Sequence, residues 1–490
     1  MKKYVYPAIL AFIAITICSK SSFLYPFNDW VDANCFFTVG KGMMNGLVPN
    51  RDLYEQKGPL LYFIYGISWL IANKAFIGAY LFELIAAFAY LVYADRTLSL
   101  FGFGKTAKAV LLAATAYATY AFSAMAHGGS AEELCLPFFA AALYHTAEAA
   151  ERGGAISLKA AAADGAMFGC VLMIKYNLVG FYIGYVIFAA VLALRNGGLK
   201  NAAKTAGCFA AGAVAAVLPW VIYFAANGAL GDIWGVYFVD NATTYGVSMT
   251  LMQKVGFILS KTANSLSDEG AVLLIAMAAG LLVFFADRKR KLMTKLMIPL
   301  MFIIQSVFLY IGGRSYVYYS MATHVFAVII AAGLGRAAVA AAEKLKLPSF
   351  RRAAVAATCA SAVALAGAAY LTYKYTPFMR EDKNSLMQYR FAAEMEDGAT
   401  LLDYGGLDCG LYTTSGILPT CKYFCKLNID DKEMLIAQSQ YVKDGATEYI
   451  VIRDGGGRKA ANSFDGYTQI DEQQQVFEGQ RFTYRLYKRD

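Results

Sequence analysis

The stretch from Trp30 to Phe63 reads WVDANCFFTVGKGMMNGLVPNRDLYEQKGPLLYF, and it lies between two apolar runs near the N-terminus. It gathers charged side chains in a part of the chain that otherwise has the composition of a membrane protein. Charged groups held against a bilayer are costly and are usually retained for a function. The functional interpretation of the sequence therefore depends on this loop, whose charged residues include Asp32, Arg51, Asp52, Glu55 and Lys57.

The composition of the chain sets its class. Hydrophobic residues make up 58% of it and charged residues only 16%, whereas a soluble protein of this length needs more polar surface to cover its core. Long apolar runs recur from residue 4 to about residue 373 and then stop. Only helices and closed barrels satisfy the backbone in lipid, and runs that are continuous rather than alternating exclude a barrel. The sequence thus predicts an all-α polytopic membrane protein.

Counting roughly 20 residues per crossing gives about eleven transmembrane helices. The first apolar run is short, and a cleaved signal peptide is its alternative interpretation. The predicted spans cover residues 4–22, 76–94, 107–125, 133–150, 160–175, 177–194, 205–225, 269–286, 295–312, 317–335 and 354–373.

The distribution of lysine and arginine predicts the orientation, because short loops rich in these residues stay in the cytoplasm. With the N-terminus inside, the basic clusters at residues 96–108, 195–204, 288–295 and 336–352 fall on the cytoplasmic side. The first loop, about residues 23–75, and the C-terminus then lie outside. This arrangement accounts for much of the net charge of +9, so no nucleic-acid partner is needed to explain it.

The chain changes character after residue 375, where charges become frequent and no apolar run is long enough to span a membrane. We therefore expect a transmembrane domain over residues 1–375 and a small soluble extracytoplasmic α/β domain over residues 376–490. Its predicted strands cover residues 400–404, 448–453 and 482–488, and its predicted amphipathic helices cover residues 383–396 and 430–443.

Three cysteines, Cys409, Cys421 and Cys425, belong to this C-terminal domain. They leave room for one disulfide, but the sequence does not choose the pair. The other cysteines lie in or beside spans and are interpreted as packing residues. Neither a G-x-x-x-x-G-K-[ST] nucleotide loop nor a G-x-S-x-G elbow occurs, which excludes enzymes built on those motifs.

The first loop divides into two helical parts with a polar link. Residues 32–46 have the pattern of a helix that lies on the membrane surface, and residues 60–69 have that of a second surface-lying or re-entrant helix. Asp32 precedes Lys57 by about 25 positions, so that the two side chains can flank a lipid phosphate. The carboxylate would take a proton from an acceptor, and the cation would offset charge on a leaving phosphate.

Two segments of this loop resemble the motifs of a known family. The segment DANCF at residues 32–36 is similar to an acid-first D-E-x-x-Y motif, and KGPLLYF at residues 57–63 is similar to a K-P-P-L-x-Y-W motif. The chain thus resembles the GT-C superfamily of membrane glycosyltransferases, in the family 39-like branch of aminoarabinose transferases and protein O-mannosyltransferases. Residues 128–133, 175–177 and 314–319 also look similar.

The chain departs from that pattern at three positions. Ala33 replaces the second acid, and Gly58 replaces the first proline. Gln56 stands where the aminoarabinose transferases have a glutamate suggested to hold a metal, while Glu55 is shifted by one position. Use of a divalent metal ion is therefore left open.

The resemblance implies an inverting glycosyltransferase of the bacterial cytoplasmic membrane, with its active site on the extracytoplasmic side. The donor would be a sugar on a polyprenyl phosphate, and the acceptor a glycolipid, a cell-envelope polymer or a protein. Asp32 would act as the general base in a single displacement at the anomeric carbon. The donor phosphate would be bound by Lys57 first, and then by Arg51, Lys175 and Arg314. Further candidate site residues are Asp52, Glu55, Glu132, Glu133, His324 and Tyr318.

Each of these residues also has a structural interpretation. Asp32 is a favoured N-cap residue, and Lys57 and Lys175 are placed to snorkel toward headgroups. Acidic residues such as Glu132 and Glu133 favour helix N-termini. His324 suits a hydrogen-bonded packing role, and residues 314–319 suit an aromatic belt at the membrane interface. Asp29 and Asp52 compete with Asp32 for the role of base.

Two other function classes remain. One is a transporter or flippase of lipid-linked saccharides, whose intramembrane charges would line a path. The other is a non-catalytic envelope assembly protein that binds a partner through its C-terminal domain. Consumption of a polyprenyl-phosphate sugar distinguishes the transferase from both.

Overall fold

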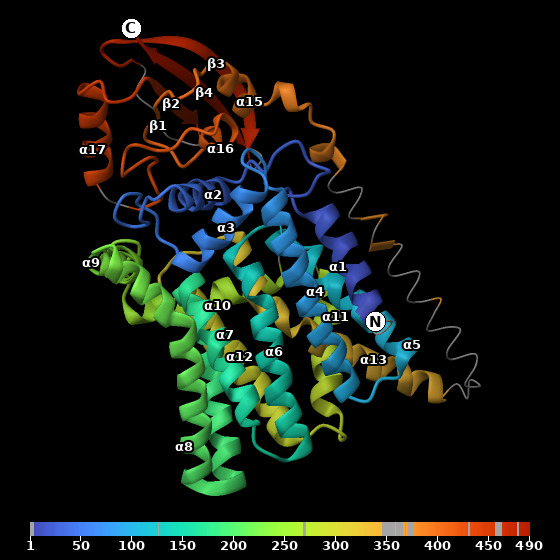
Figure 1. Ribbon diagram of the computed structural model, residues 1–490. Coiled ribbons are helices and arrows are strands. Elements are labelled where there is room, and N and C mark those ends of the chain that lie inside the picture. The colour runs from blue at the N-terminus through green and yellow to red at the C-terminus, as the bar shows by residue number, and fades with distance from the viewer. Residues whose placement is uncertain are drawn as a thin grey trace. The chain divides into compact units, whose positions relative to one another are not determined.

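The structure is a computed structural model that describes residues 4–125, 127–267, 271–344, 358, 366–367, 369–370, 376–429, 432–455, 463–477 and 480–490. The chain folds into two compact units (Figure 1). The first unit consists of Met1–Ser19, Phe82–Pro219 and Ser248–Tyr375, and the second of Lys20–Leu81, Trp220–Val247 and Thr376–Asp490. The first loop of the sequence therefore belongs to the same unit as the C-terminal chain. The division at residue 375 into a transmembrane and a soluble domain stays a prediction.

The first unit is helical in its described residues. It contains all or most of α1 (Val5–Cys18), α4 (Ile77–Leu100), α5 (Lys105–Tyr120), α6 (Ala131–Arg152), α7 (Leu158–Ile174), α8 (Gly180–Ala226), α10 (Leu251–Ser267), α11 (Ala271–Ala286), α12 (Leu292–Tyr310) and α13 (Ala327–Lys344). Short 3₁₀ segments at Ser123–Met125, Tyr176–Val179 and Val317–Phe326 connect some of them.

Each of the first ten predicted spans coincides with an apolar helix or helix pair. Residues 177–194 and 205–225 join in α8, which Figure 1 shows as two helices that turn back on each other. The turn lies at Gly197 and Gly198, where the φ angle of +63° at Gly198 favours glycine. The eleventh predicted span, residues 354–373, lies largely outside the described residues.

Four helical stretches of the described chain are long and apolar enough to cross a membrane: Ile77–Leu100, Tyr176–Ala226, Leu292–Tyr310 and Val317–Lys344. The helices at the other predicted spans do not meet both conditions; α1, for example, ends after 14 residues. The predicted number of eleven crossings and the orientation of the N-terminus therefore stay predictions.

In the second unit, the C-terminal chain forms a small mixed sheet. The strands are β1 (Leu401–Asp403), β2 (Tyr449–Gly455), β3 (Tyr467–Phe477) and β4 (Gln480–Arg489), in the spatial order β1-β2-β4-β3. β1 pairs parallel to β2, and β4 pairs antiparallel to β2 and to β3. The helices of this part are α15 (Met387–Ala393), α16 (Leu411–Ser415) and α17 (Lys432–Lys443), with a 3₁₀ turn at Lys383–Ser385. In Figure 1, α17 and α15 flank the sheet on different sides.

The predicted α/β character of the C-terminal chain agrees with this sheet. The predicted strands overlap β1, β2 and β4, and the helix predicted over residues 430–443 overlaps α17. Strand β3 was not predicted, because its sequence YTQIDEQQQVF carries polar side chains on both faces. Such a strand suits the edge of a sheet, where one side of its backbone has no neighbour.

The first loop forms two packed helices, α2 (Val31–Met44) and α3 (Pro59–Ile71). The two backbones cross at Gly40, where an added Cβ would lie 2.5 Å from the amide nitrogen of Gly66 and 2.6 Å from the carbonyl oxygen of Tyr62. Gly46 ends the turn after α2 with a φ of +88°, and Pro59 opens α3 at a position that favours proline. The loop helices were predicted within a few residues of these bounds.

The close crossing predicts that Gly40→Ala destabilises the second unit. A methyl group at Gly40 must push α3 away, and overpacking of this kind costs roughly 1–3 kcal/mol. The measurement is the thermal unfolding of the purified protein in detergent. Gly231→Ala is the matched control, since an added Cβ at Gly231 meets no atom within 4 Å. Equal unfolding temperatures for the two variants would show that the helices do not approach this closely.

Candidate active site

The N-terminus of α2 holds Asp32. The N-cap residue of this helix is Trp30, and no side chain caps it with a hydrogen bond. Asp32 is therefore in the first turn and is not the N-cap residue, which argues against the capping interpretation. Its side chain is half-buried. The helix dipole favours a carboxylate in the first turn. The helix end therefore accommodates the charge of Asp32, although Asp32 is not the N-cap residue.

Lys57 lies beside the same face of α2, at the start of α3. Its ammonium nitrogen is 5.3 Å from the ring centroid of Phe36 and 3.6 Å from Oε1 of Glu55. Because Phe36 follows Asp32 by four residues, the two side chains share one face of the helix. Lys57 thus contacts a ring that shares one helix face with Asp32.

Glu55 organises the start of α3. Its side chain is buried, and Oε2 accepts hydrogen bonds from the backbone amide of Lys57, at 2.9 Å, and from the hydroxyl of Tyr62. The backbone carbonyl of Glu55 accepts a hydrogen bond from Asn50 at 2.7 Å. These contacts hold the polar link in one conformation.

Arg51 and Asp52 form a local pair. The guanidinium group donates two hydrogen bonds of 2.8 Å to the carboxylate of Asp52, and a third of 2.8 Å to the carbonyl of Asn227. The pairing with Arg51 holds the pKa of Asp52 below its ordinary value. Asp29 is also paired, with Lys20 at 2.6 Å. The two carboxylates that compete with Asp32 are therefore each bound to a cation.

The residues around Gln56 decide whether the loop fits a divalent metal ion. Within the described residues, no three His, Cys, Asp or Glu side chains converge on one point. The nearest carboxylate in sequence, Glu55, is already bound to Lys57 and Tyr62. The residues of the loop do not fit a metal site, so we derive no chemical step through a metal.

A polar stripe on α2 faces the C-terminal chain of the same unit. Asn34 accepts a hydrogen bond from Thr413 at 2.9 Å, and Thr38 donates one to Asp408 at 2.7 Å. Lys41 donates to two backbone carbonyls, those of Tyr412 at 2.6 Å and Ile417 at 2.5 Å. The sequence suggested a helix on the membrane surface, but nearly all of its side chains are buried in protein. A spacing of four and then three residues between the polar positions was the available signal.

Burial shifts the proton equilibria of this stripe. It lowers the pKa of Lys41 to about 7, and a neutral amine has two N–H groups for the two carbonyls that it meets. Burial also raises the pKa of Asp408 to about 6, and burial together with the charge of Asp408 raises the pKa of Asp403 to about 7. Titration of these groups therefore changes the stability of the second unit near neutral pH.

In the first unit, three further candidates, Glu132, Lys175 and Tyr318, lie close together with Tyr319. The carboxylate of Glu132, in the first turn of α6, lies 2.5 Å from the ammonium group of Lys175. The ammonium group is 4.1 Å from the ring centroid of Tyr319 and 5.3 Å from that of Tyr318. Both charged side chains are buried. Among the described residues, the second oxygen of Glu132 has no hydrogen-bond partner, which leaves an acceptor in this cluster.

The remaining candidates of the first unit are Glu133, Arg314 and His324. Ser130 caps α6 by accepting a hydrogen bond from the amide of Glu133 at 3.1 Å, and the carboxylate of Glu133 accepts one from Gly129 at 2.9 Å. Arg314 is half-buried in the connection that follows α12. His324 forms a hydrogen bond of 3.0 Å with the carbonyl of Thr119, as expected for a packing residue.

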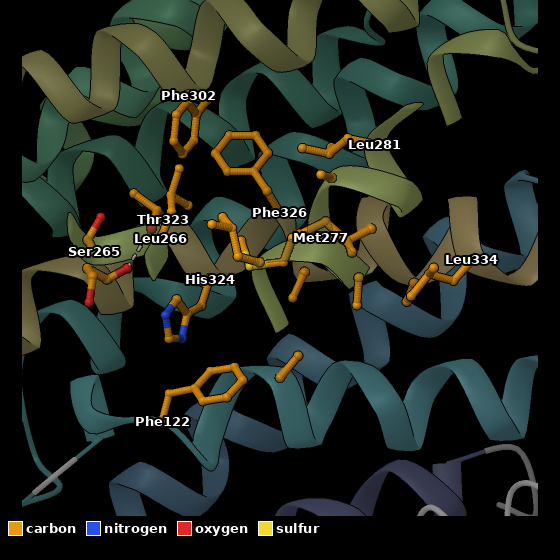
Figure 2. Close-up of a pocket in the computed structure, with 18 of the residues that line it drawn as sticks. Phe122, Ser265, Leu266, Met277, Leu281, Phe302, Thr323, His324, Phe326 and Leu334 are labelled. Carbon is orange, nitrogen blue, oxygen red and sulfur yellow. Dashed lines mark hydrogen bonds between the residues drawn. The ribbon is translucent and has the colours of Figure 1, made fainter. Parts of the chain in front are cut away.

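His324 also lines a cavity of about 520 Å³ in the first unit. Figure 2 shows its imidazole and the ring of Phe122 at one side of this space, and the rings of Phe302 and Phe326 at the other. Most of the remaining lining side chains are apolar, such as Met277. The cavity thus suits an apolar ligand with a polar group near His324. The sequence did not predict it, since its lining comes from several helices.

The pKa of Asp403 predicts how stability depends on pH. A folded-state pKa of about 7, above the unfolded value of about 3.9, gives stability that is present at low pH and is lost as the pH rises through 7. We expect Asp403→Asn to flatten the fall in stability between pH 4 and 7, by up to about 1.4 kcal/mol per pH unit. Thermal unfolding as a function of pH measures this.

Two other variants check the assignment. Lys41 has a lowered pKa, so its contribution is present above pH 10.5 and is lost as the pH falls through 7; Lys41→Met should therefore change the slope only above pH 7. Asp444→Asn, at an exposed position after α17, should leave the profile unchanged. An unaltered slope in Asp403→Asn below pH 7 would contradict the shifted equilibrium.

Comparisons with known proteins bear on the fold. No protein-family model and no curated protein matches the chain. Solved structures similar to it include ArnT from Cupriavidus metallidurans, bound to undecaprenyl phosphate (TM-score 0.60) and in the apo state (TM-score 0.61). Each is 14% identical to this chain, and each match covers 97% of both chains. The chain therefore has the fold of these ArnT structures, which agrees with the fold that the resemblance of the first loop implied.

Proposed function

We propose that this protein is an inverting glycosyltransferase that moves a sugar from a polyprenyl-phosphate donor to an acceptor outside the cytoplasmic membrane. The observation that carries the proposal is the contact of Lys57 with Phe36, which follows Asp32 by one turn on the same face of α2, within one packed pair of helices. A carboxylate and an ammonium group on this pair of helices match the two needs of the reaction. The shared fold with a structure that binds undecaprenyl phosphate supports the choice of donor.

The proposed reaction is a single displacement. The carboxylate of Asp32 takes the proton of the acceptor hydroxyl or amine while the acceptor attacks the anomeric carbon. The bond from that carbon to the phosphate oxygen breaks, and the polyprenyl phosphate leaves with the electron pair. Lys57 offsets the negative charge on the phosphate, so the leaving group needs no general acid. Configuration at the anomeric carbon is inverted.

Two features of the first unit agree with a lipid-linked ligand. The apolar cavity beside His324 suits a segment of an isoprenoid chain. The second carboxylate oxygen of Glu132 is buried and has no hydrogen-bond partner among the described residues, whereas buried acceptors are nearly always satisfied. Lys175, which is already paired with Glu132, stays a predicted phosphate ligand.

Transport of a lipid-linked saccharide is the second candidate, and one observation favours it. Asp164, fully buried within α7, binds His145 of α6 at 2.8 Å and Tyr185 of α8 at 2.8 Å. Ionisable groups within a transmembrane segment often mark a path. However, both oxygens of Asp164 are occupied by neighbouring helices, which is the arrangement of a clasp between helices. The donor assay below separates the two functions, because a transporter does not consume its cargo.

The general-base assignment predicts that Asp32→Asn abolishes transfer. Loss of a general base costs about 10²- to 10⁴-fold in rate, so we expect at least a hundredfold lower kcat with little change in the KM for the donor. The assay uses purified protein in lipid nanodiscs with undecaprenyl-phosphate hexose or pentose radiolabelled in the sugar, and envelope lipids and proteins as acceptors.

The two competing carboxylates provide the contrast. Asp29→Asn and Asp52→Asn remove charges that are bound to Lys20 and Arg51, and we expect less than a tenfold loss of rate in either. Full activity in Asp32→Asn, or a larger loss in Asp52→Asn, would transfer the role of base away from Asp32. Unchanged unfolding temperatures establish that the variants are folded.

The phosphate assignment predicts a graded effect of two cations in the same loop. Lys57→Met should lower kcat/KM at least tenfold and raise the KM for the donor, because the ammonium group contacts the phosphate in both the bound and the transition state. Arg51→Met should have a smaller effect, since the guanidinium group donates three hydrogen bonds of 2.8 Å to Asp52 and Asn227, whereas Lys57 and Glu55 are 3.6 Å apart. Competition by undecaprenyl phosphate alone measures the affinity directly. Equal losses in the two variants would contradict the ranking.

A further inference from the structure

We propose that Cys35 and Cys425 form a disulfide bond that fastens the C-terminal chain to helix α2. The two Sγ atoms lie 3.7 Å apart, although 390 positions separate the residues in the sequence. A disulfide needs about 2.05 Å between the sulfurs, so the two atoms must approach by roughly 1.7 Å for the bond to form. This inference rests on the extracytoplasmic placement that the proposed function includes.

Neighbouring hydrogen bonds hold the two segments that carry the thiols beside each other. On the α2 side, Cys35 lies between Asn34 and Thr38, whose hydrogen bonds to Thr413 and Asp408 fix the same pair of segments. On the other side, the backbone carbonyl of Lys422 accepts a hydrogen bond of 2.9 Å from the amide of Tyr54 in the first loop.

The rings of Tyr54 and Tyr423 are also in contact, with centroids 5.3 Å apart. The contact between the sulfurs is thus bracketed on both sides by other contacts of the same two segments.

The other cysteines of the C-terminal chain are placed differently. Cys421 packs in the core of the sheet beside Ile450 and Tyr487. Cys409 is buried next to Asp403, whose charge adds to the effect of burial in raising the pKa of the thiol. Of the thiols in the described residues, the structure records a sulfur–sulfur contact for Cys35 and Cys425. The sequence allowed one disulfide among Cys409, Cys421 and Cys425. The proposed bond instead pairs Cys425 with Cys35 of the first loop.

Formation of the bond requires an oxidant, for which the natural class is the disulfide of an extracytoplasmic thiol oxidoreductase. One cysteine thiolate attacks that disulfide and forms a mixed disulfide, and the second thiolate then displaces the oxidoreductase thiol. Two electrons pass to the oxidoreductase, whose two thiolates take up the two protons that the cysteines lose, so that it is left as a dithiol. Burial raises the pKa of both thiols, so the exchange takes place during folding, before α2 is covered.

The bond would have a consequence for the site. Cys35 follows Asp32 by one turn of α2, so a covalent link here fixes the helix that carries the proposed base against the C-terminal chain. Loop closure over hundreds of residues restricts the unfolded chain strongly. Reduction should therefore lower the unfolding temperature of the full-length protein and should leave that of a Cys35→Ser/Cys425→Ser variant unchanged.

The direct test is differential thiol labelling of the full-length protein expressed in a bacterial cytoplasmic membrane. Cells are quenched in acid, free thiols are blocked with N-ethylmaleimide in denaturant, the protein is reduced, and newly exposed thiols are labelled with deuterated N-ethylmaleimide. Mass spectrometry of the peptides then assigns each cysteine. We expect the deuterated label on most copies of Cys35 and Cys425, and the first label on Cys409 and Cys421.

Single variants keep the test decisive. Cys35→Ser should move Cys425 to the first label, whereas Cys421→Ser, the matched buried control, should leave the pattern unchanged. The first label on most copies of Cys35 and Cys425, or pairing of Cys425 with Cys409 or Cys421, would overturn the inference. The proposed transferase is measured separately by consumption of the donor, so absence of the bond in an active enzyme refutes only the disulfide.

Discussion

Helix α2 is enclosed by protein, and the second unit depends on satisfying the polar groups that this enclosure buries. The amine of Lys41 is buried away from water, so its N–H groups need acceptors, which the carbonyls of Tyr412 and Ile417 supply. Thr38 and Asn34 need partners for the same reason and find them in Asp408 and Thr413. Removal of one partner leaves the other buried and unsatisfied, which costs more than the bond itself contributes. The C-terminal chain is therefore a structural requirement of the first loop.

The opposite side of α2 follows a different constraint. Gly40 has no side chain, so the backbone of α3 approaches closely, and the polar link that precedes α3 is drawn toward the first turns of α2. This approach brings Lys57 to the ring of Phe36. The position of the proposed phosphate ligand is thus a consequence of helix packing two turns away from it. A larger residue at the crossing would move Lys57 as well as α3.

Local signals explain what the sequence could predict. Gly46 follows the end of α2 and Pro59 begins α3, so the sequence predicted the bounds of both loop helices to within a few residues. Long apolar runs predicted the positions of most helices of the first unit. The polar stripe on α2 has a readable spacing, but nothing in the spacing identifies a partner more than 370 residues away. The pair of Glu132 and Lys175 also joins residues that are far apart in the sequence, with 43 positions between them. Strand β3 was missed because an edge position tolerates polar residues on both faces.

The choice among the acidic residues of the loop can be argued from their partners. A carboxylate that accepts two hydrogen bonds from a guanidinium group, as Asp52 does from Arg51, is stabilised in its charged form and is a weaker base. Asp29 is paired with the ammonium group of Lys20 at 2.6 Å. Each of these ion pairs must be broken before its carboxylate can take a proton from an acceptor. Asp32 lies in the first turn of α2, where the partial positive charge of the helix end favours a carboxylate. The choice of Asp32 as the proposed base thus rests on the ion pairs of Asp29 and Asp52 and on the position of Asp32 at the helix end.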